Sequence, residues 1–291
     1  MFCSSKFCIY IEDRIKKLID NIYSFLGSLL DRVPIFEPDR ILKFSFDIFM
    51  LFFLLLLIAN IVLKFGFELI ENSYNPSIWI VFEIFPPWLF FFEILLDLNT
   101  SYYSKGVYVS RRSKIFKHYL KHSFLLDVIT IFPLLISDNE IAYYLEILVV
   151  LRLKNLDVLL KRLEEYLQLK GKKEGAFQLI KLIVSLLFLA HLCACAWHYV
   201  GIWEISLGVT DNWINRNNIE TEPWFIRYIY SFYFSIVTMM TVGYGDITAN
   251  NYIECSFSIC MIIYGCGVFA YSINNIGVIF KEMYQEDKDF K

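Results

Sequence analysis

Long, nearly uncharged apolar stretches constrain the fold of this chain more than any other feature of its sequence. One of them reads IFMLFFLLLLIANIVL over residues 48–63. A helix that crosses a bilayer needs about 20 predominantly apolar residues. Hydrophobic residues make up 57% of the 291 residues, above the roughly 45–50% that is usual in soluble domains. The sequence therefore predicts an all-α membrane protein, because helices satisfy their own backbone polar groups in lipid.

The apolar segments predict six membrane-spanning helices, at roughly 42–64, 78–99, 121–137, 141–162, 177–203 and 251–283. Pro86 and Pro87 are expected to kink the second helix, and Pro133 is expected to distort or end the third. Residues 224–240 are apolar and aromatic but too short to cross and return as two helices. They predict a re-entrant helix followed by a loop, because non-helical backbone at membrane depth needs protein or water around it.

The distribution of lysine and arginine predicts the orientation of these helices. Residues 100–121 and 161–181 each carry six of them, whereas the connections on the opposite side contain only Arg216. By the positive-inside rule the protein is multi-pass with both termini in the cytoplasm. The plasma membrane is the expected location, and an organelle membrane is the alternative. An aromatic belt is expected near the outer face from Trp79, Trp203, Trp213 and Trp224.

Residues 1–37 form a predicted cytoplasmic N-terminal segment ahead of the first span. Their apolar residues recur at helical spacing, which suits a helix on the membrane surface or, equally, one packed on protein. The seven cysteines show no metal-ligand spacing, so neither a structural metal nor a disulfide framework is expected. His191 and His198 are seven residues apart in the fifth span. Hydrogen-bonded packing is the preferred interpretation of this pair, and haem ligation is the alternative.

The run TVGYGD at residues 241–246 stands between the re-entrant segment and the last apolar helix. A cation that crosses a membrane must exchange its water shell for other oxygens, which rings of backbone carbonyls can supply. The backbone must then alternate between conformations that L-residues tolerate poorly, and Gly243 and Gly245 provide that freedom. The negative end of a helix over 225–239 would point at the ion path.

The other residues of this run have expected roles of their own. The Thr241 hydroxyl would add an inner ring of oxygens, and the ring of Tyr244 would pack outward against the re-entrant helix. Asp246 would lie at the mouth and attract cations. The expected cation-coordinating set is Thr241, Val242, Gly243, Tyr244 and Gly245.

The run TVGYGD, with a short amphipathic helix before it and a glycine-bearing helix after it, resembles the signature of tetrameric potassium channels. The resemblance extends over residues 38–283. The stretches FFFEILLDLNTSYYSKG, HYLKHSFLLDVITIFP and AHLCACAWHYVG are similar to the cyclic-nucleotide-gated, hyperpolarisation-activated and ether-à-go-go superfamily. Family positions in the second, third and fifth spans are matched by Asp97, by Asp127, and by His191 with Cys195. The resemblance implies six transmembrane helices plus a re-entrant pore helix and a selectivity-filter loop that binds K⁺.

Three features depart from the family pattern. Met240 stands where threonine usually precedes the filter, which changes the packing behind it, and the fourth span is poor in charge. The sequence stops at Lys291, before the helical linker and cyclic-nucleotide-binding β-roll that the family carries. No cyclic-nucleotide site is therefore expected within these residues. Whether they are part of a longer protein or a stripped channel stays open.

The resemblance implies a voltage-sensor-like four-helix domain at 38–162 and a pore domain at 177–283. A short linker at 163–176 would join them, and a cytoplasmic tail at 284–291 would follow. The candidate sensor cations are Arg152, Lys154, Lys161 and Arg162, with counter-charges Glu93, Asp97 and Asp127. Static ion pairs that brace a four-helix bundle are the alternative. The candidate gate or hinge residues are Gly265, Gly267, Asn274 and Asn275.

Together these observations predict a K⁺-selective channel subunit, not an enzyme, that conducts passively through a tetrameric pore and responds weakly to voltage. In a register of every third residue, only Arg152 lies well inside the fourth span. The expected partners are three further subunits, forming a homotetramer, and the lipid bilayer, with no nucleic acid and no cofactor besides permeant K⁺. The alternatives are a weakly selective cation channel of the hyperpolarisation-activated type, a non-conducting structural subunit of a larger membrane complex, and a membrane redox enzyme.

Overall fold

A computed structural model describes residues 35–37, 40–67, 80–104, 107–136, 140–167 and 172–289. These residues are almost entirely helical, with one two-stranded sheet among them, so the predicted all-α class is confirmed. By compactness the chain divides into residues 1–51 with 83–154, and residues 52–82 with 155–291. Apart from residues 35–37, the predicted N-terminal segment lies outside the described residues, as does Trp79.

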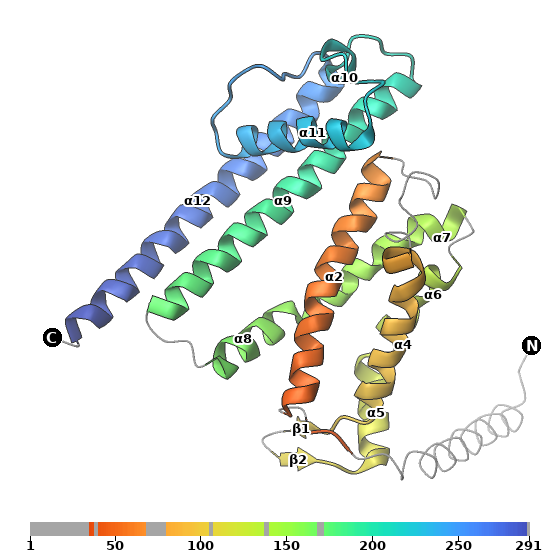
Figure 1. The fold of residues 1–291 in the computed structure, drawn as a ribbon, viewed down its shortest axis with the longest axis vertical. Helices are drawn as coiled ribbons and strands as arrows, with labels where there is room; N and C mark the ends of the chain where they lie inside the picture. Colours follow the sequence, from red (N-terminus) through yellow and green to blue (C-terminus); the bar gives the residue numbers. More distant parts are fainter. Residues whose placement is uncertain are drawn as a thin grey trace, which may run out of the picture. The chain divides into compact units, whose positions relative to one another are not determined.

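The first unit holds the start of the first predicted span, most of the second and fourth, and all of the third (Figure 1). A short antiparallel hairpin connects the second span to the third, with Tyr103 opposite Tyr108. In chain order the elements are α2 (Ile41–Phe67, which continues into the second unit), the π-helical turn η2 (Ile80–Ile84), α4 (Phe85–Leu98), β1 (Tyr102–Ser104), β2 (Val107–Val109), α5 (Arg112–His122), α6 (Phe124–Leu135), α7 (Glu140–Leu145) and the 3₁₀ helix η3 (Glu146–Asn155).

Prolines lie at the start of the helix in the second predicted span and near the end of the helix in the third. Pro86 and Pro87 occupy the first turn of α4, directly after η2. The first turn of a helix tolerates proline because its N–H groups have no intrahelical acceptor. The second span therefore consists of a π-helical turn followed by a regular helix. Pro133 lies near the end of α6, which stops at Leu135.

The predicted fourth span is not one regular helix. α7 gives way to η3 at Glu146, and α8 (Leu156–Tyr166) follows. Residues three apart lie on one line of a 3₁₀ helix, because it has three residues per turn. Along the line that starts at Glu146, the exposed fractions of Glu146 and Val149 are 2% and 0%. The series of every third residue from Glu146, in which the sequence places Arg152, thus lies on the buried face of η3. The next helix, α8, belongs to the second compact unit.

The second unit contains the C-terminal half of α2, α8, α9 (Lys172–Ser206), α10 (Trp213–Arg216), α11 (Trp224–Met239) and α12 (Tyr252–Asp289). α11 packs on both α9 and α12, which also pack on each other (Figure 1). Among the described helices, α2, α9 and α12 are long and apolar enough to cross a membrane, and α6 is apolar but shorter. α11 has the length and place of the predicted re-entrant helix.

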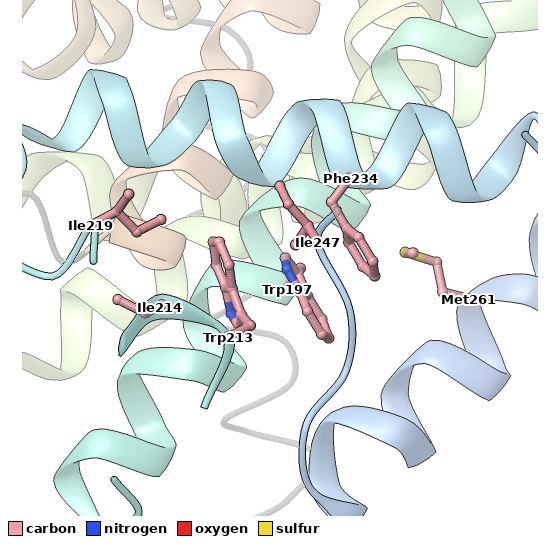
Figure 2. Packing of buried hydrophobic residues seen from close by; sticks show 7 residues of the cluster. All are labelled: Trp197, Trp213, Ile214, Ile219, Phe234, Ile247 and Met261. Carbon is pink, nitrogen blue, oxygen red and sulfur yellow. The ribbon is translucent and has the colours of Figure 1, made fainter. Parts of the chain in front are cut away.

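An aromatic core fixes α9, α10, α11 and α12 to one another (Figure 2). The ring of Trp197 stacks on Phe234 at 4.3 Å and on Trp213 at 5.5 Å between centroids. Both tryptophans are fully buried. Large buried aromatic rings contribute much packing energy, so this core holds α11 at a defined place against α9 and α12. The remaining members of the cluster are Ile214, Ile219, Ile247 and Met261.

Two histidines of α9 connect that helix to the end of α2. The His191 ring contacts the Ala59 carbonyl at 3.0 Å and the Tyr228 hydroxyl at 3.0 Å, so both ring nitrogens have partners. The Nδ1 atom of His198 lies 2.6 Å from the Gly66 carbonyl. These contacts support the packing interpretation of the histidine pair. They leave His191 no free nitrogen for a haem iron.

Candidate functional site

The loop after α11 has the alternating backbone that the sequence predicts. The φ angles of Thr241, Gly243 and Gly245 are 57°, 61° and 78°, so every second residue is left-handed. Glycine adopts this conformation without a steric penalty. Thr241 shares it although a left-handed φ costs a β-branched residue about 1–3 kcal/mol. Strain of this kind, held by its surroundings, is typical of a functional loop.

The last turn of α11 holds the start of this loop in place. The Val242 N–H donates to the Val237 carbonyl at 3.0 Å, and the Thr241 N–H donates to the Thr238 carbonyl at 3.1 Å. The carbonyls at the end of a helix lack intrahelical partners, and the loop amides supply them here. The negative end of the α11 dipole is therefore directly beside the loop.

Side chains of the loop are open to the surroundings in the single chain. Val242 and Tyr244 are 52% and 73% exposed, so Tyr244 does not bury its ring against α11 of its own chain. Asp246 accepts a hydrogen bond from the Tyr233 hydroxyl at 2.7 Å. This bond holds the pKa of the Asp246 carboxyl below its usual range. The residue at the end of the loop is therefore anionic at neutral pH.

Two buried glutamates that the sequence did not single out, Glu204 of α9 and Glu254 of α12, connect these helices with α10 and with the loop before α12. The Glu254 carboxylate accepts hydrogen bonds from the Trp213 and Asn250 N–H groups, each at 2.7 Å. Glu204 accepts from the Asn251 side chain at 3.0 Å and lies near Glu254. Both carboxyl groups are fully buried. The signal in the sequence is an acidic residue near the end of each of two apolar helices.

The predicted gate residues lie on an uninterrupted α12. A Cβ atom added at Gly265 would lie 3.1 Å from the Met239 Cα, whereas one added at Gly267 would meet nothing within 4 Å. Gly265 therefore lets α12 approach the end of α11 closely. Asn274 is exposed and Asn275 is half-buried in the single chain. Their role in gating stays a prediction.

The first unit brings together Arg152 of η3, Glu93 of α4 and Asp127 of α6. The guanidinium lies 2.5 Å from the Glu93 carboxylate and 3.0 Å from that of Asp127. It also donates to the Thr130 hydroxyl at 2.8 Å and lies 3.9 Å from the centre of the Phe90 ring. Two of the three predicted counter-charges thus surround the predicted sensor cation. Thr130 lies three residues after Asp127 and therefore on the same helix face. This spacing could have indicated from the sequence that Thr130 is a further partner of Arg152.

The third predicted counter-charge has a different partner. Asp97 pairs with Lys43 of α2 at 2.8 Å, and the same ammonium lies 2.6 Å from Asp47. The Lys43 side chain is only 8% exposed. Nothing in the sequence indicates that this lysine lies near Asp97, because the two residues are 54 positions apart.

The remaining predicted sensor cations are not buried. Lys154 is exposed, and its ammonium lies 3.4 Å from the His122 carbonyl. Lys161 and Arg162 are exposed on α8, outside the unit that contains Arg152. Among the four candidates, Arg152 alone has an ion-paired and mostly buried side chain in the described part of the chain.

Comparison of the sequence with known proteins identifies a matching family and several relatives. Residues 43–288 match the family described as Ion transport protein. The chain is 27% identical over 242 residues to the human voltage-gated delayed rectifier potassium channel KCNH5, covering 74% of this chain and 24% of that protein. It is 25% identical to the potassium voltage-gated channel protein eag of Drosophila melanogaster, covering 67% of this chain and 18% of that protein.

A plant potassium channel is also similar in sequence to this chain. The potassium channel AKT1 of Arabidopsis thaliana is 31% identical over 197 residues, covering 64% of this chain and 22% of that protein. The chain thus spans about a quarter or less of the length of these relatives. They confirm the predicted resemblance to the voltage-gated potassium channel superfamily, and they favour a channel over the redox enzyme. Since the match to the family extends over most of its length, the chain belongs to the ion transport protein family.

Proposed function

We propose that this chain is a subunit of a K⁺-selective channel whose filter is formed by residues 241–245. The observation that carries the proposal is the left-handed φ at Thr241, Gly243 and Gly245. Such alternation allows successive carbonyl oxygens to line one path, where they replace the hydration shell of an ion. The negative end of α11 and the anionic Asp246 would favour cations near that path.

The open loop suggests what the partners are. A filter of this kind is built from four loops around one axis, and three further copies of this chain would supply the other walls. Tyr244 and Val242, exposed in the single chain, would then be covered by neighbouring subunits. No cofactor besides permeant K⁺ is part of the proposal, and no cyclic-nucleotide site is proposed within these residues.

The membrane arrangement follows from charge and length. α2, α9 and α12 are the longest apolar helices of the described chain, and the basic connections at 100–121 and 161–181 would face the cytoplasm. Both termini would then be cytoplasmic, with α11 entering from the outer side. We propose a multi-pass protein of the plasma membrane.

The voltage response is proposed to be weak. A sensor helix must carry several cations through the membrane field, and steep channels move about 3–4 charges per subunit. Arg152 is the one candidate cation held inside the Glu93–Asp127 cluster. The first unit would mainly brace the pore, and another stimulus would open it.

Recordings of the purified chain in planar bilayers test the proposal. With K⁺ on one side and Na⁺ on the other, we expect currents that reverse near the K⁺ equilibrium potential. Reversal near zero would instead show the weakly selective cation channel. Absence of current from protein that forms tetramers on native mass spectrometry would indicate the non-conducting structural subunit.

A further inference from the structure

Glu204 and Glu254 bring two carboxyl groups into the interior of the second unit. Glu204 lies near the end of α9, and Glu254 lies in the first turn of α12. Both residues are 0% exposed, and their carboxyl groups lie near each other. The Asn251 side chain connects them further, because its amide donates to Glu204 at 3.0 Å and its oxygen accepts from the Glu254 N–H at 3.0 Å.

No basic side chain compensates this pair in the described part of the chain, and the charged group that acts on Glu254 is Glu204. Arg216 pairs with Asp211 at 3.0 Å, and both are exposed. The Nδ1 atom of His198 faces the Gly66 carbonyl. Between residues 190 and 253, the acidic, basic and histidine residues other than Glu204 are His191, His198, Asp211, Arg216, Glu220, Glu222, Arg227 and Asp246.

Hydrogen bonds distinguish the two carboxyl groups. Both oxygens of Glu254 accept from backbone N–H groups, those of Trp213 and Asn250, each at 2.7 Å. The Oε2 atom of Glu204 accepts from Asn251, whereas its Oε1 atom is buried and receives no hydrogen bond from the described residues. An ionised carboxylate only accepts, and a protonated one can donate. A proton on the pair is therefore best placed on Glu204 Oε1, with Glu254 as the ionised acceptor.

Two ionised carboxylates at this place would be costly. Burial disfavours each charge when no cation compensates it, and two like charges that share a site disfavour each other. We propose that Glu204 and Glu254 form a proton-binding site, in which the protonated Glu204 donates to the ionised Glu254 at neutral pH. The bound proton would keep the loop before α12 joined to α9 and α10.

This loop connects the proposed filter to α12. Glu254 holds the Trp213 and Asn250 N–H groups, and Trp213 stacks on Trp197 at 5.5 Å. Ile247, the residue after the TVGYGD run, belongs to the same aromatic core (Figure 2). Loss of the proton would leave two negative charges that repel each other. The contact of α9 with the loop would then weaken.

Infrared spectroscopy of the full chain in nanodiscs tests the site without any use of current. We expect the carbonyl-stretch band of a protonated carboxylic acid at neutral pH, with a component that disappears as the pH rises and is lost in E204Q. The matched control is E220Q, because Glu220 is an exposed glutamate between α10 and α11, and this variant should keep the band. A spectrum that E204Q leaves unchanged would overturn the proposal.

Thermal unfolding in detergent tests which carboxyl group carries the proton. Glutamine at position 204 replaces a protonated acid, because its amide can accept from Asn251 and donate to Glu254. Glutamine at position 254 places an NH₂ group against a backbone N–H that needs an acceptor. We expect E204Q to unfold near the wild-type temperature at neutral pH, and E254Q roughly 3–8 °C lower. Failure of E204Q to fold, or E254Q as stable as E204Q, would overturn the assignment.

The pH dependence of stability has a defined sign. In the unfolded chain both glutamates are ionised above about pH 5, so the native pair binds one proton more. The unfolding equilibrium constant should then rise up to about tenfold per pH unit, until the native pair also loses its proton. E204Q should lack this component. A bound metal cation would give the opposite result, with a wild type that EDTA destabilises and rising pH stabilises, and would overturn the proposal.

Current gives one further readout, which alone rests on the proposed function. We expect external alkaline solution to speed the decay of K⁺ current in wild type, because the loop after the filter loses support, and to have a smaller effect in E204Q. Equal effects in the two proteins would overturn the link to the filter. The infrared and unfolding results do not depend on conduction, so failure of the channel proposal and failure of the proton site are distinguishable.

Discussion

The loop after α11, as the proposed filter, and the Arg152 cluster would hold a cation with oxygen atoms of opposite kinds. The loop would use neutral backbone carbonyls, set by left-handed φ angles at every second residue. The cluster uses two carboxylates and a hydroxyl that hold a tethered guanidinium at 2.5–3.0 Å. Neutral oxygens bind an ion weakly enough to release it. Buried carboxylates hold their cation in place, because separating the pair leaves a charge uncompensated.

The contrast predicts that the loop is sensitive to backbone changes and the cluster to charge changes. The largest effect is expected from G243A, because alanine at a φ of 61° costs about 1–2 kcal/mol in each subunit. No atom of the single chain lies within 4 Å of the added Cβ, so the backbone rather than a clash would be responsible. We expect loss of K⁺ selectivity or of current in assembled protein.

The matched control for G243A is G267A. Gly267 lies within α12, and its added Cβ also meets nothing within 4 Å. This variant should keep the wild-type ratio of K⁺ to Na⁺ permeability. An unchanged permeability ratio in G243A itself would remove the filter assignment.

R152Q tests whether the positive charge of Arg152 stabilises the cluster. It leaves the Glu93 and Asp127 carboxylates without their guanidinium, and removing one partner of a buried ion pair costs about 3–5 kcal/mol. We expect a clear drop in the unfolding temperature of the purified protein in detergent. K161Q, at an exposed position of α8, should change the free energy of unfolding by no more than about 0.5 kcal/mol. Equal unfolding temperatures for both variants would show that the ion pairs contribute nothing to stability.

G66A tests how closely α2 and α9 must approach. An added Cβ would lie 2.7 Å from the Cys195 Cβ and 2.8 Å from its carbonyl oxygen. We expect a loss of about 1–3 kcal/mol in unfolding free energy, since backbone has to move. G277A serves as the control, because an added Cβ there meets nothing within 4 Å and alanine favours the helix by up to about 1 kcal/mol. A G66A protein as stable as G277A would contradict the close contact.

Y233F is expected to have the smallest effect. The Tyr233 hydroxyl hydrogen-bonds to Asp246 and lowers the pKa of that carboxyl. Without the bond the pKa rises toward its ordinary value, so Asp246 becomes protonated at a higher external pH. Titration of the current with external acid should therefore show inhibition beginning at higher pH in Y233F than in wild type. Y230F, on the same helix, should titrate as wild type; coincident curves for all three proteins would remove Asp246 from the conduction path.

Features that depend on a local residue type could be predicted from the sequence, whereas features that depend on contacts between distant residues could not. Gly243 and Gly245 reveal the loop because a left-handed φ has a local requirement that the residue type itself satisfies. The 3₁₀ conformation of η3 and the partner of Asp97 depend on contacts between distant residues. Lys43 and Asp97 are 54 positions apart, and neither residue type indicates the other. The Glu204–Glu254 pair was missed for the same reason.

The central claim is that the proposed filter is joined to a sensor-like unit in which Arg152 alone, among the four candidate sensor cations, is held by ion pairs. The gating charge from the limiting slope of the conductance–voltage curve tests it most directly. One charge per subunit predicts about four per tetramer, which at 2.3 kcal/mol per charge per 100 mV gives roughly 9 kcal/mol, against roughly 28–37 for a steep sensor. A value near four would agree with Arg152 as the one cation that senses the field. A value above about eight would show that Lys154, Lys161 or Arg162 also crosses it and would contradict the claim.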